Sequence, residues 1–574
     1  MNQSVPQDHP KRNVTSDINC LSSNFFQQPP TERSRCIGVY SLSKSSNLLI
    51  FRQVRGKNGK NSGTLVNLAC TCRAFSTSAP DVLWEHLDSF VRLIQCLPRD
   101  LFKPQHEARW PDGVAGSKLT LERAISVKDW KIFFKYSSRL RSVASGRSYR
   151  SLNDQGCTRY TNDVIFAFCH PSTGGPLIPR LKELSWDIPG QVYASLLHHL
   201  LTPSLVSLTI HDINTLANPL RAPEVSVLSY IAIACPLLKV LKIESPLWSC
   251  NSLNSEGSRI LSTAILSLNS LRKLPGVTLD EQTILHVSRL QLTELSMSLP
   301  AGLSVDNIRP HLTAPAFGSV DALTVHANTF PALTLLLEAL EITPKSVTLR
   351  VETASVVEQI KPLFTALVNA CSSEELLKIC LDTPNLHYDQ PFQWSHAFNL
   401  DMLEPLFSLP HTSSFTLDVP HKIMLDDADI TTIAKHWPNL RTLSINEMNS
   451  WNGYDPSPTT HRSLLALAAH CPELAEIAMS IDFSEIDVES PELLHSRPNG
   501  GVTNRNLSAA FFMAIKIDHS GAIAGFLSDA FPRLFRVMAR WRMNAFAFDD
   551  EEDESSDMYE MRWSEVEDLL STVG

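Results

Sequence analysis

The chain has no long apolar run. Nowhere in its 574 residues do about 18 apolar residues follow one another, the length that a membrane-spanning helix requires. The first residues, Met-Asn-Gln-Ser-Val-Pro, are polar and lack the apolar centre of a secretion signal. The sequence therefore predicts a protein of the cytoplasm or the nucleus with no membrane partner.

An excess of basic residues is also missing. Lys and Arg total 50 against 60 Asp and Glu, which gives a net charge of −10 and a sequence pI near 6.0. A protein whose main task is to hold a phosphate backbone has the opposite balance. We therefore expect no nucleic-acid partner.

Signatures of catalysis, metal binding and cofactor binding are absent as well. The 12 cysteines include no C-x-x-C pair, and Cys70-Thr-Cys72 alone is too little for zinc. The basic stretch 55–63 superficially resembles a phosphate-binding loop, but that motif needs a glycine where Val54 stands and a hydroxyl where Asn61 stands. Neither H-E-x-x-H nor G-x-S-x-G occurs. We expect a protein that is not an enzyme and binds no metal or cofactor.

What the chain does contain is one short phrase, Leu-x-x-Leu-x-Ile or a close variant, that returns along most of its length. The pattern predicts a β-strand whose fourth and sixth residues point inward, with the first at the bend before it. The copies lie mostly about 20 to 40 residues apart, near the period of leucine-rich repeats. They begin at Leu181, Leu205, Leu238, Leu292, Val320, Leu376, Leu440, Leu474 and Leu534, with weaker copies over 271–276, 346–351 and 414–419.

The stretches between the copies have helical periodicity, and several end at a proline. One such stretch has acidic residues over 426–429, where a helix N-terminus favours negative charge, and ends at Trp437-Pro438. Cys235 and Cys471 also precede repeat prolines and are expected to be small buried thiols. One strand and one helix per unit predict an α/β leucine-rich-repeat solenoid, horseshoe-like in form. Chance matches of a common residue are the alternative, against which the shared lead-in argues.

A different pattern precedes the repeats. Residues 63–88 form a helical pair in which the positions that carry a likeness are Leu68, Cys72, Arg73, Phe75, Ala79, Leu83, Trp84 and Leu87. This run resembles the second half of an F-box, in the form found in fungal, basidiomycete-type F-box and leucine-rich-repeat proteins. The resemblance implies a small all-α F-box-like head in front of the solenoid.

The likeness has one departure. F-boxes usually open with a Leu-Pro-x-Glu stretch that leads into an apolar helix, and none precedes Leu65. Residues 48–54 have the character of the tail of that helix. We hypothesise that the F-box is incomplete, with its first part missing or replaced.

These observations divide the chain into five parts. We expect a disordered N-terminal segment (1–46), partial F-box-like helices (47–98), a helical linker region (99–175), the leucine-rich-repeat solenoid (176–545), and an acidic loop with a C-terminal capping helix (546–574).

The resemblance implies a substrate-recognition subunit of a cullin-type ubiquitin ligase, in which the N-terminal helices bind a Skp-type adaptor and the repeats bind a protein substrate. The adaptor-binding residues that it implies are Leu65, Leu68, Cys72, Arg73, Phe75, Leu83 and Trp84. Each of these side chains could instead form the core of a three-helix head. Exposed strand positions are weaker candidates for substrate contact: Lys182, Lys242, Arg350 and Arg441.

Two other functions stay open, a non-catalytic leucine-rich-repeat scaffold with a decayed F-box and a leucine-rich GTPase activator. The acidic run 549–557 is expected to be a solvated loop. Its alternatives are a docking strip for a basic partner or phosphorylation at Ser555 or Ser556.

Overall fold

The computed structural model describes the chain in stretches. These are residues 44–55, 62–71, 75–105, 118–144, 159–172, 174–188, 191–211, 222–244, 255–300, 302–312, 315–352, 356–372, 374–383, 397–447, 457–486, 500–513, 517–540 and 554–573. The chain divides into two compact units. Unit 1 comprises Met1–Pro246 with Ser267–Ser270, and unit 2 comprises Leu247–Leu266 with Leu271–Gly574.

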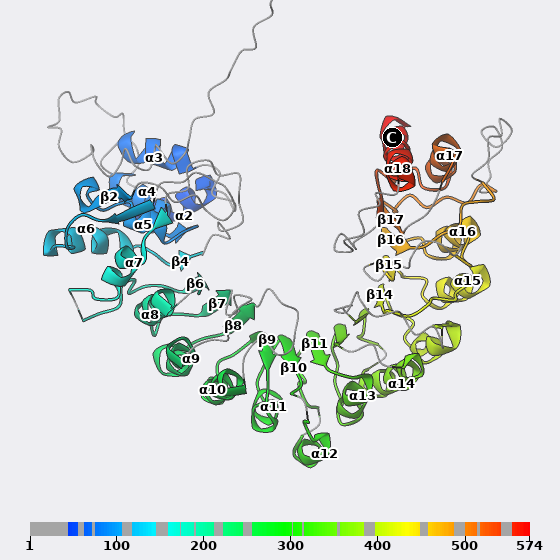
Figure 1. The fold of residues 1–574 in the computed structure, drawn as a ribbon, viewed down its shortest axis with the longest axis horizontal. Coiled ribbons are helices and arrows are strands. Elements are labelled where there is room, and N and C mark those ends of the chain that lie inside the picture. The colour runs from blue at the N-terminus through cyan, green and yellow to red at the C-terminus, as the bar shows by residue number, and fades with distance from the viewer. Residues whose placement is uncertain are drawn as a thin grey trace, which may run out of the picture. The chain divides into compact units, whose positions relative to one another are not determined.

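Unit 1 has a parallel sheet with a helix before each of its described strands, and the helices lie on one side of the strands (Figure 1). In spatial order the strands are β1 (His86–Leu87), β4 (Ser142–Val143), β6 (Glu183–Asp187), β7 (Ser207–His211) and β8 (Val240–Glu244). The helices are α2 (Lys44–Arg55), α3 (Ser62–Thr71), α4 (Phe75–Leu83), α5 (Val91–Ile94), η1 (Arg99–Leu101), α6 (Val127–Ser137), α7 (Asn162–Phe168), α8 (Gln191–Leu200) and α9 (Ala222–Ala234).

Unit 2 repeats the same strand and helix arrangement. Its parallel strands follow one another in sequence order: β9 (Lys273–Thr278), β10 (Glu294–Ser298), β11 (Ala322–Ala327), β12 (Ser346–Val351), β13 (Lys378–Asp382), β14 (Ser414–Asp418), β15 (Thr442–Ile445), β16 (Glu476–Met479), β17 (Ala509–Met513) and β18 (Arg536–Arg540).

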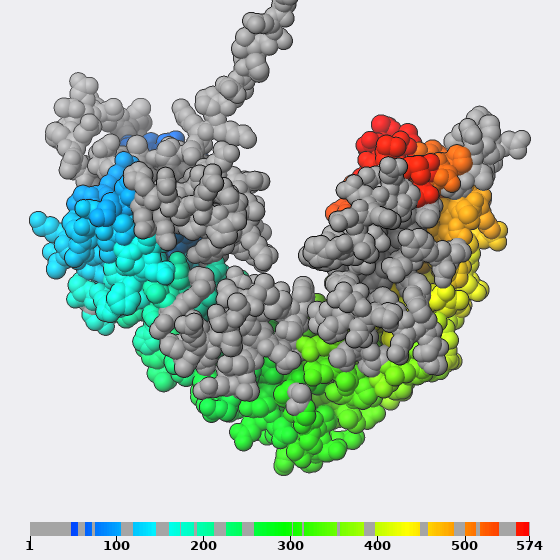
Figure 2. Space-filling model, viewed as in Figure 1, coloured from blue at the N-terminus to red at the C-terminus, as the bar shows by residue number. Residues whose placement is uncertain are grey.

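The helices of unit 2 lie on one side of these strands (Figure 1), and in the space-filling view the colours of this unit run from green through yellow to red (Figure 2). These helices are α10 (Ser255–Ile265), α11 (Glu281–Val287), α12 (Val305–Ile308), η2 (Arg309–His311), α13 (Phe330–Glu338), η3 (Val357–Gln359), α14 (Ile360–Ala370), η4 (Leu400–Met402), η5 (Glu404–Ser408), α15 (Asp427–His436), α16 (His461–His470), α17 (Ser520–Ala530) and α18 (Glu554–Val573).

The repeated phrase forms strands with the predicted orientation. In the copy that contains β15, Leu440 lies before the strand and is fully buried, and Leu443 and Ile445 point into the core. The weak copy at β9 joins the sheet through a local irregularity. Gly276 has a φ of +83°, and the register between β9 and β10 shifts beside it. That bulge lets both Leu274 and Val277 face inward. The prediction of a repeated strand and helix unit is confirmed.

The prolines explain where the repeat helices end. Trp437, Cys471 and Phe531 each follow the last helical residue and have φ near −120° to −134°, outside the helical region. A proline after such a residue disfavours helical backbone there. At the other end of α15, Asp426 and Asp429 form a reciprocal capping box, so the predicted N-terminus of this helix is confirmed.

The structure differs from the expected layout at several places. Strands β1 and β4 lie before residue 176 and pair within the repeat sheet, so the region 47–98 is not purely helical. The expected helical linker 99–175 also contains a three-stranded sheet, formed by β2 (Phe102–Gln105), β3 (Lys118–Leu121) and β5 (Arg159–Tyr160). Its strands are short and far apart in sequence, so they leave no local pattern.

Parts of all five expected segments fall outside the described residues, most of all at the two ends of the chain. Residues 1–43 lie outside them, while residues 44–46, expected to be disordered, begin α2. The stretch 541–553, with most of the acidic run, also lies outside them, and Ser555 and Ser556 occupy the first turn of α18. Helix α18 contacts α17 and β18 at the end of unit 2.

Candidate adaptor-binding head

Helices α2, α3 and α4 contact one another and form a three-helix head. The inner face of α2 is set by Asn47 and Phe51, which are buried and lie four positions apart, on one side of the helix. The Phe51 ring meets the Phe75 ring of α4 edge to face at 5.2 Å between centroids. This contact fixes how α2 is rotated against the rest of the head.

Two arginines attach the end of α2 to the segment after α4. Arg52 binds the carboxylate of Glu85 through two hydrogen bonds of 2.6 and 2.8 Å. Arg55 donates to the carbonyls of Val82 and His86 at 3.1 and 2.9 Å. Helix α2 is therefore bound to the rest of unit 1 by both apolar and charge-assisted contacts.

These contacts shift the pKa values of Arg52, Glu85 and Arg55. The hydrogen bond to Glu85 raises the pKa of Arg52. Burial alone would raise the pKa of Glu85, but the bonds and charge of Arg52 outweigh it, and the pKa of Glu85 falls below its usual range. Burial lowers the pKa of Arg55. The carboxylate of Glu85 is thus held ionised.

Three of the predicted adaptor-binding residues form the core of the head. Leu65 is completely buried, and Leu83 and Trp84 are 7% and 4% exposed. The Trp84 ring lies 4.6 Å from the ring of Tyr136 in α6. These three side chains have little exposed surface in the described head, which favours the alternative of a core role. Their role as adaptor contacts stays a prediction.

The other predicted residues lie differently. Leu68 and Phe75 are half-buried, so they stay candidates for contact, and Cys72 and Arg73 lie outside the described residues. The backbone of Ser555 and Ser556 is helical, at the start of α18.

The structure adds two residues that the sequence did not single out. On α2, Leu49 is 63% exposed and lies opposite the buried face of Asn47 and Phe51, and Ile50 is 47% exposed at the side of that face. The run from Leu48 to Phe51 is apolar at every position, so its sequence could not show which members face outward. Asn47, the polar residue before this run, would suggest the solvent-facing side of the helix, but its side chain is buried.

Two of the four predicted cations of the strands pair with acids of a neighbouring repeat. Arg350 of β12 pairs with Asp382 of β13 at 2.9 Å. Arg441 lies 3.6 Å from Glu473. Lys242 is half-buried, and Lys182 is exposed.

Two chemical possibilities were tested on the described stretches. No group of three or more His, Cys, Asp or Glu side chains in them could hold a metal ion. No helix in them is both long and apolar enough to cross a membrane.

Comparison with known proteins adds little to this geometry. No family model matches the chain, and no curated protein is significantly similar to it. One solved structure similar to it is the complex of Rad7 and Elc1 in yeast, at 14% identity, over 70% of this chain and 88% of the other, with a TM-score of 0.29. A likeness with so low a TM-score carries no argument about fold or function.

Proposed function

We propose that this chain is a non-catalytic substrate-recognition subunit of a cullin-type ubiquitin ligase. The head of α2, α3 and α4 binds a Skp-type adaptor, and the strand and helix repeats bind a protein substrate. The role requires no reacting group in the chain, because the ligase complex supplies the chemistry.

The observation that carries the proposal is the outer face of α2. An F-box head needs a first helix with an apolar surface, and α2 stands where the sequence alone had no complete first helix. It is held in place by Phe51 and Arg52, so Leu49 and Ile50 are presented on a fixed helix. Burying two such side chains in a partner groove stabilises a complex by about 1.5 to 3 kcal/mol each when burial is complete.

Co-purification of the full-length chain with a Skp-type adaptor tests this role. The informative variant is Leu49→Asp with Ile50→Asp, because both side chains point to solvent and their replacement leaves the head core intact. We expect binding to fall at least about tenfold. The matched control is Leu335→Asp with Met561→Asp, two exposed apolar positions in α13 and α18 of unit 2.

Retention of adaptor by the α2 variant at wild-type level would contradict the proposal for this face. Failure of the wild-type chain to bind any Skp-type adaptor would support the second candidate, an interaction scaffold with a decayed F-box. The burial of Leu65, Leu83 and Trp84 favours that second candidate, since it removes three expected contacts from the surface.

A further inference from the structure

A row of backbone hydrogen bonds runs across unit 1 at the edge where its strands begin. The amide of Arg141 donates to the carbonyl of Glu85 at 2.8 Å, that of Lys182 to Arg141 at 2.7 Å, that of Val206 to Lys182 at 2.8 Å, and that of Lys239 to Val206 at 2.8 Å. These five residues therefore occupy one equivalent position in successive repeats. Neighbouring positions in such a row lie about 4.8 Å apart.

Positive charge accumulates along this row. Arg141, Lys182 and Lys239 belong to it, and Arg180 precedes Lys182 by two residues; we name these four the basic edge. Arg180, Lys182 and Lys239 are exposed and Arg141 is half-buried. The Arg141 side chain donates to the carbonyl of Arg180 at 3.4 Å, and its charge is one of those that lower the pKa of Glu85. Within the described parts of the chain, none of the four forms an ion pair with an acid.

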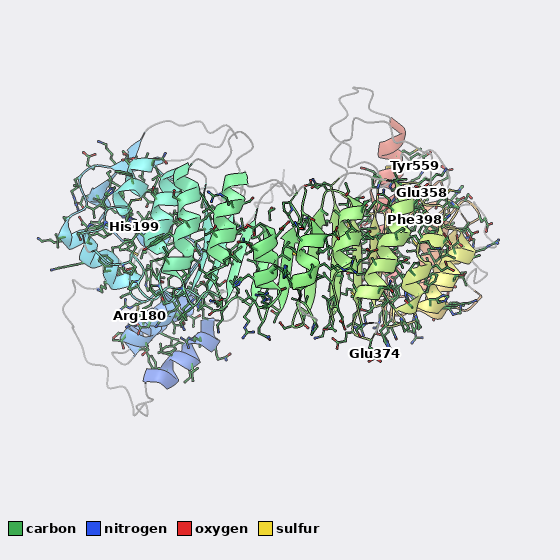
Figure 3. The ribbon with its side chains drawn as sticks, turned by 90° about the horizontal axis from the view of Figure 1, so that it is seen from below. Arg180, His199, Glu358, Glu374, Phe398 and Tyr559 are labelled. Atoms are coloured by element: carbon green, nitrogen blue, oxygen red, sulfur yellow. The ribbon has the colours of Figure 1, made fainter. Side chains whose placement is uncertain are left out.

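Figure 3 shows Arg180 beside the blue helices of the head and His199 farther from those helices. The hydrogen-bonded row agrees with this view, because it begins at Glu85, to which Arg52 of α2 is bound. The basic edge thus continues from the head into the repeats.

The acids near this edge do not neutralise it. Glu85 already forms an ion pair with Arg52, and Arg55 lies close to Glu85 as a further cation. Glu183, which follows Lys182 at the start of β6, is exposed, and the other acid of β6, Asp187, lies at the far end of the strand. Like charges at nearby positions of the row repel one another, most strongly at low salt. The arrangement therefore lowers stability slightly, a cost that an acidic partner would reverse.

The same edge of unit 2 has a different charge pattern. There three cations at or beside the row are paired with acids of the neighbouring repeat: Lys345 lies 2.7 Å from Asp321, Lys273 lies 3.0 Å from Glu294, and Arg441 lies 3.6 Å from Glu473. Arg272, also in this row, instead donates to the carbonyl of Gln291 at 2.9 Å. The difference is one of accumulation: three cation positions of the unit 1 row, Arg141, Lys182 and Lys239, form no ion pair with an acid among the described residues, whereas in unit 2 Lys345 and Arg441 do.

We propose that the basic edge is a docking site for an acidic peptide segment of a partner protein. The four cations span about three strand spacings, or about 14 Å, which four to five residues of an extended peptide cover. Val206 lies between Lys182 and Lys239, and Leu237 is 58% exposed beside Lys239, so the site also offers apolar contact. A short acidic segment with one or two apolar residues fits this edge. A long polyanion does not, because it would also meet the repulsion of a chain with net charge −10.

The test uses the full-length chain and a fluorescein-labelled probe, Glu-Leu-Glu-Ser-Glu-Leu-Glu-Ser, with a matched probe in which Gln replaces Glu. Fluorescence anisotropy at low salt should show binding of the Glu probe at least about tenfold tighter than the Gln probe, and the affinity should fall as salt rises. The measurement needs no adaptor, so a failure of adaptor binding leaves it unaffected.

The informative variant is Arg180→Glu with Lys182→Glu and Lys239→Glu, in which the affinity for the Glu probe should drop at least about tenfold. The matched control reverses three exposed cations of unit 2, Lys435→Glu with Arg505→Glu and Arg533→Glu, and should bind as the wild type does. Both variants carry the same net charge, so a general charge effect would change them equally. Thermal unfolding checks that each variant is folded.

Three results would overturn the proposal. The first is equal binding of the Glu and Gln probes, and the second is an equal loss of affinity in both variants. The third is tighter binding of a single-stranded oligonucleotide than of the Glu probe, which would assign the edge to a nucleic acid. A further arm changes the acidic residues 549–553 to Asn and Gln; tighter probe binding there would assign the edge to the chain's own acidic run instead of a partner.

Discussion

Arg52 of α2 holds the carboxylate of Glu85 through two hydrogen bonds, although the two residues are 33 positions apart. The side chain of Arg52 is 51% exposed and that of Glu85 only 13%. The pair therefore lies at the margin of the head, where one partner is shielded from water. It joins the helix proposed for adaptor binding to the row of residues that becomes the basic edge.

This pair should contribute measurably to the stability of the head. In a double-mutant cycle with Arg52→Ala and Glu85→Ala, we expect a coupling free energy of about 0.5 to 1 kcal/mol, because two parallel hydrogen bonds are made but Arg52 is in solvent. Urea unfolding followed by tryptophan fluorescence measures it. The control cycle uses Asp88 and Arg92, an exposed pair four positions apart, for which no more than about 0.5 kcal/mol is expected. A coupling free energy of zero at Arg52 and Glu85 would show that α2 is held by Phe51 and Arg55 without this pair.

The stability of unit 1 should depend on pH through Asp129. Hydrogen bonds from Arg123 lower the pKa of Asp129 to about 2, against the opposing effect of burial. The carboxylate also accepts from the backbone and hydroxyl of Ser126 and so completes the capping box of α6. Because the folded pKa is depressed, the stabilisation is present above the unfolded value near 3.8 and is lost as pH falls towards 2.

We therefore expect Asp129→Asn to lower the free energy of unfolding at pH 7 by about 1 kcal/mol, less than the full shift would give because solvent screens Arg123. The difference between wild type and variant should shrink between pH 4 and pH 2. Urea titrations across this range measure it. Asp306→Asn, at an exposed position in α12, is the control and should show no such convergence.

The core of unit 2 should lose stability locally when a strand leucine is shortened. Leu443 of β15 is completely buried, so Leu443→Ala should cost about 2 to 5 kcal/mol. Because each repeat contacts mainly its neighbours, hydrogen exchange should accelerate first in β14, β15 and β16. Leu377→Ala, at a position 37% exposed, is the control. Uniform acceleration across unit 2 would mean that the repeats unfold as one body.

The repeats could be predicted because each inward strand position needs a bulky apolar residue, which leaves a pattern in the sequence. Strand β17 was not predicted from the sequence. Its phrase, Leu507-x-x-Ala510-x-Phe512, has an alanine at the fourth position, where the other copies have a larger apolar residue. Ala510 is still fully buried there. Its place in the sheet comes from pairing with β16 and β18, which a single phrase does not reveal.

The candidate sites depend on how α2 is rotated against the head and on the pairing register of the strands of unit 1. The sequence does not determine either of them. The outward position of Leu49 follows from Phe51 and Arg52 meeting partners on α4 and beyond it. Likewise, the sequence singled out Lys182, but it could not align that residue with Arg141 and Lys239. Their alignment requires the pairing of β4, β6, β7 and β8.

The cysteines should differ sharply in reactivity. Cys70 in α3 is exposed, whereas Cys235 and Cys471 are buried at the ends of their repeat helices, as the sequence predicted. Burial raises the pKa of Cys235 and Cys471 to about 12, so almost none of either thiol is ionised at pH 8. The thiolate is the reactive form, and iodoacetamide should therefore modify these two at least about 100-fold more slowly than Cys70. Peptide mass spectrometry locates each label, and labelling in urea should remove the difference. Equal rates for Cys70 and Cys471 in the folded chain would mean that the repeat at α16 opens readily, since the Cys471 thiol lies within 3.5 to 3.6 Å of two carbonyls of the preceding repeat.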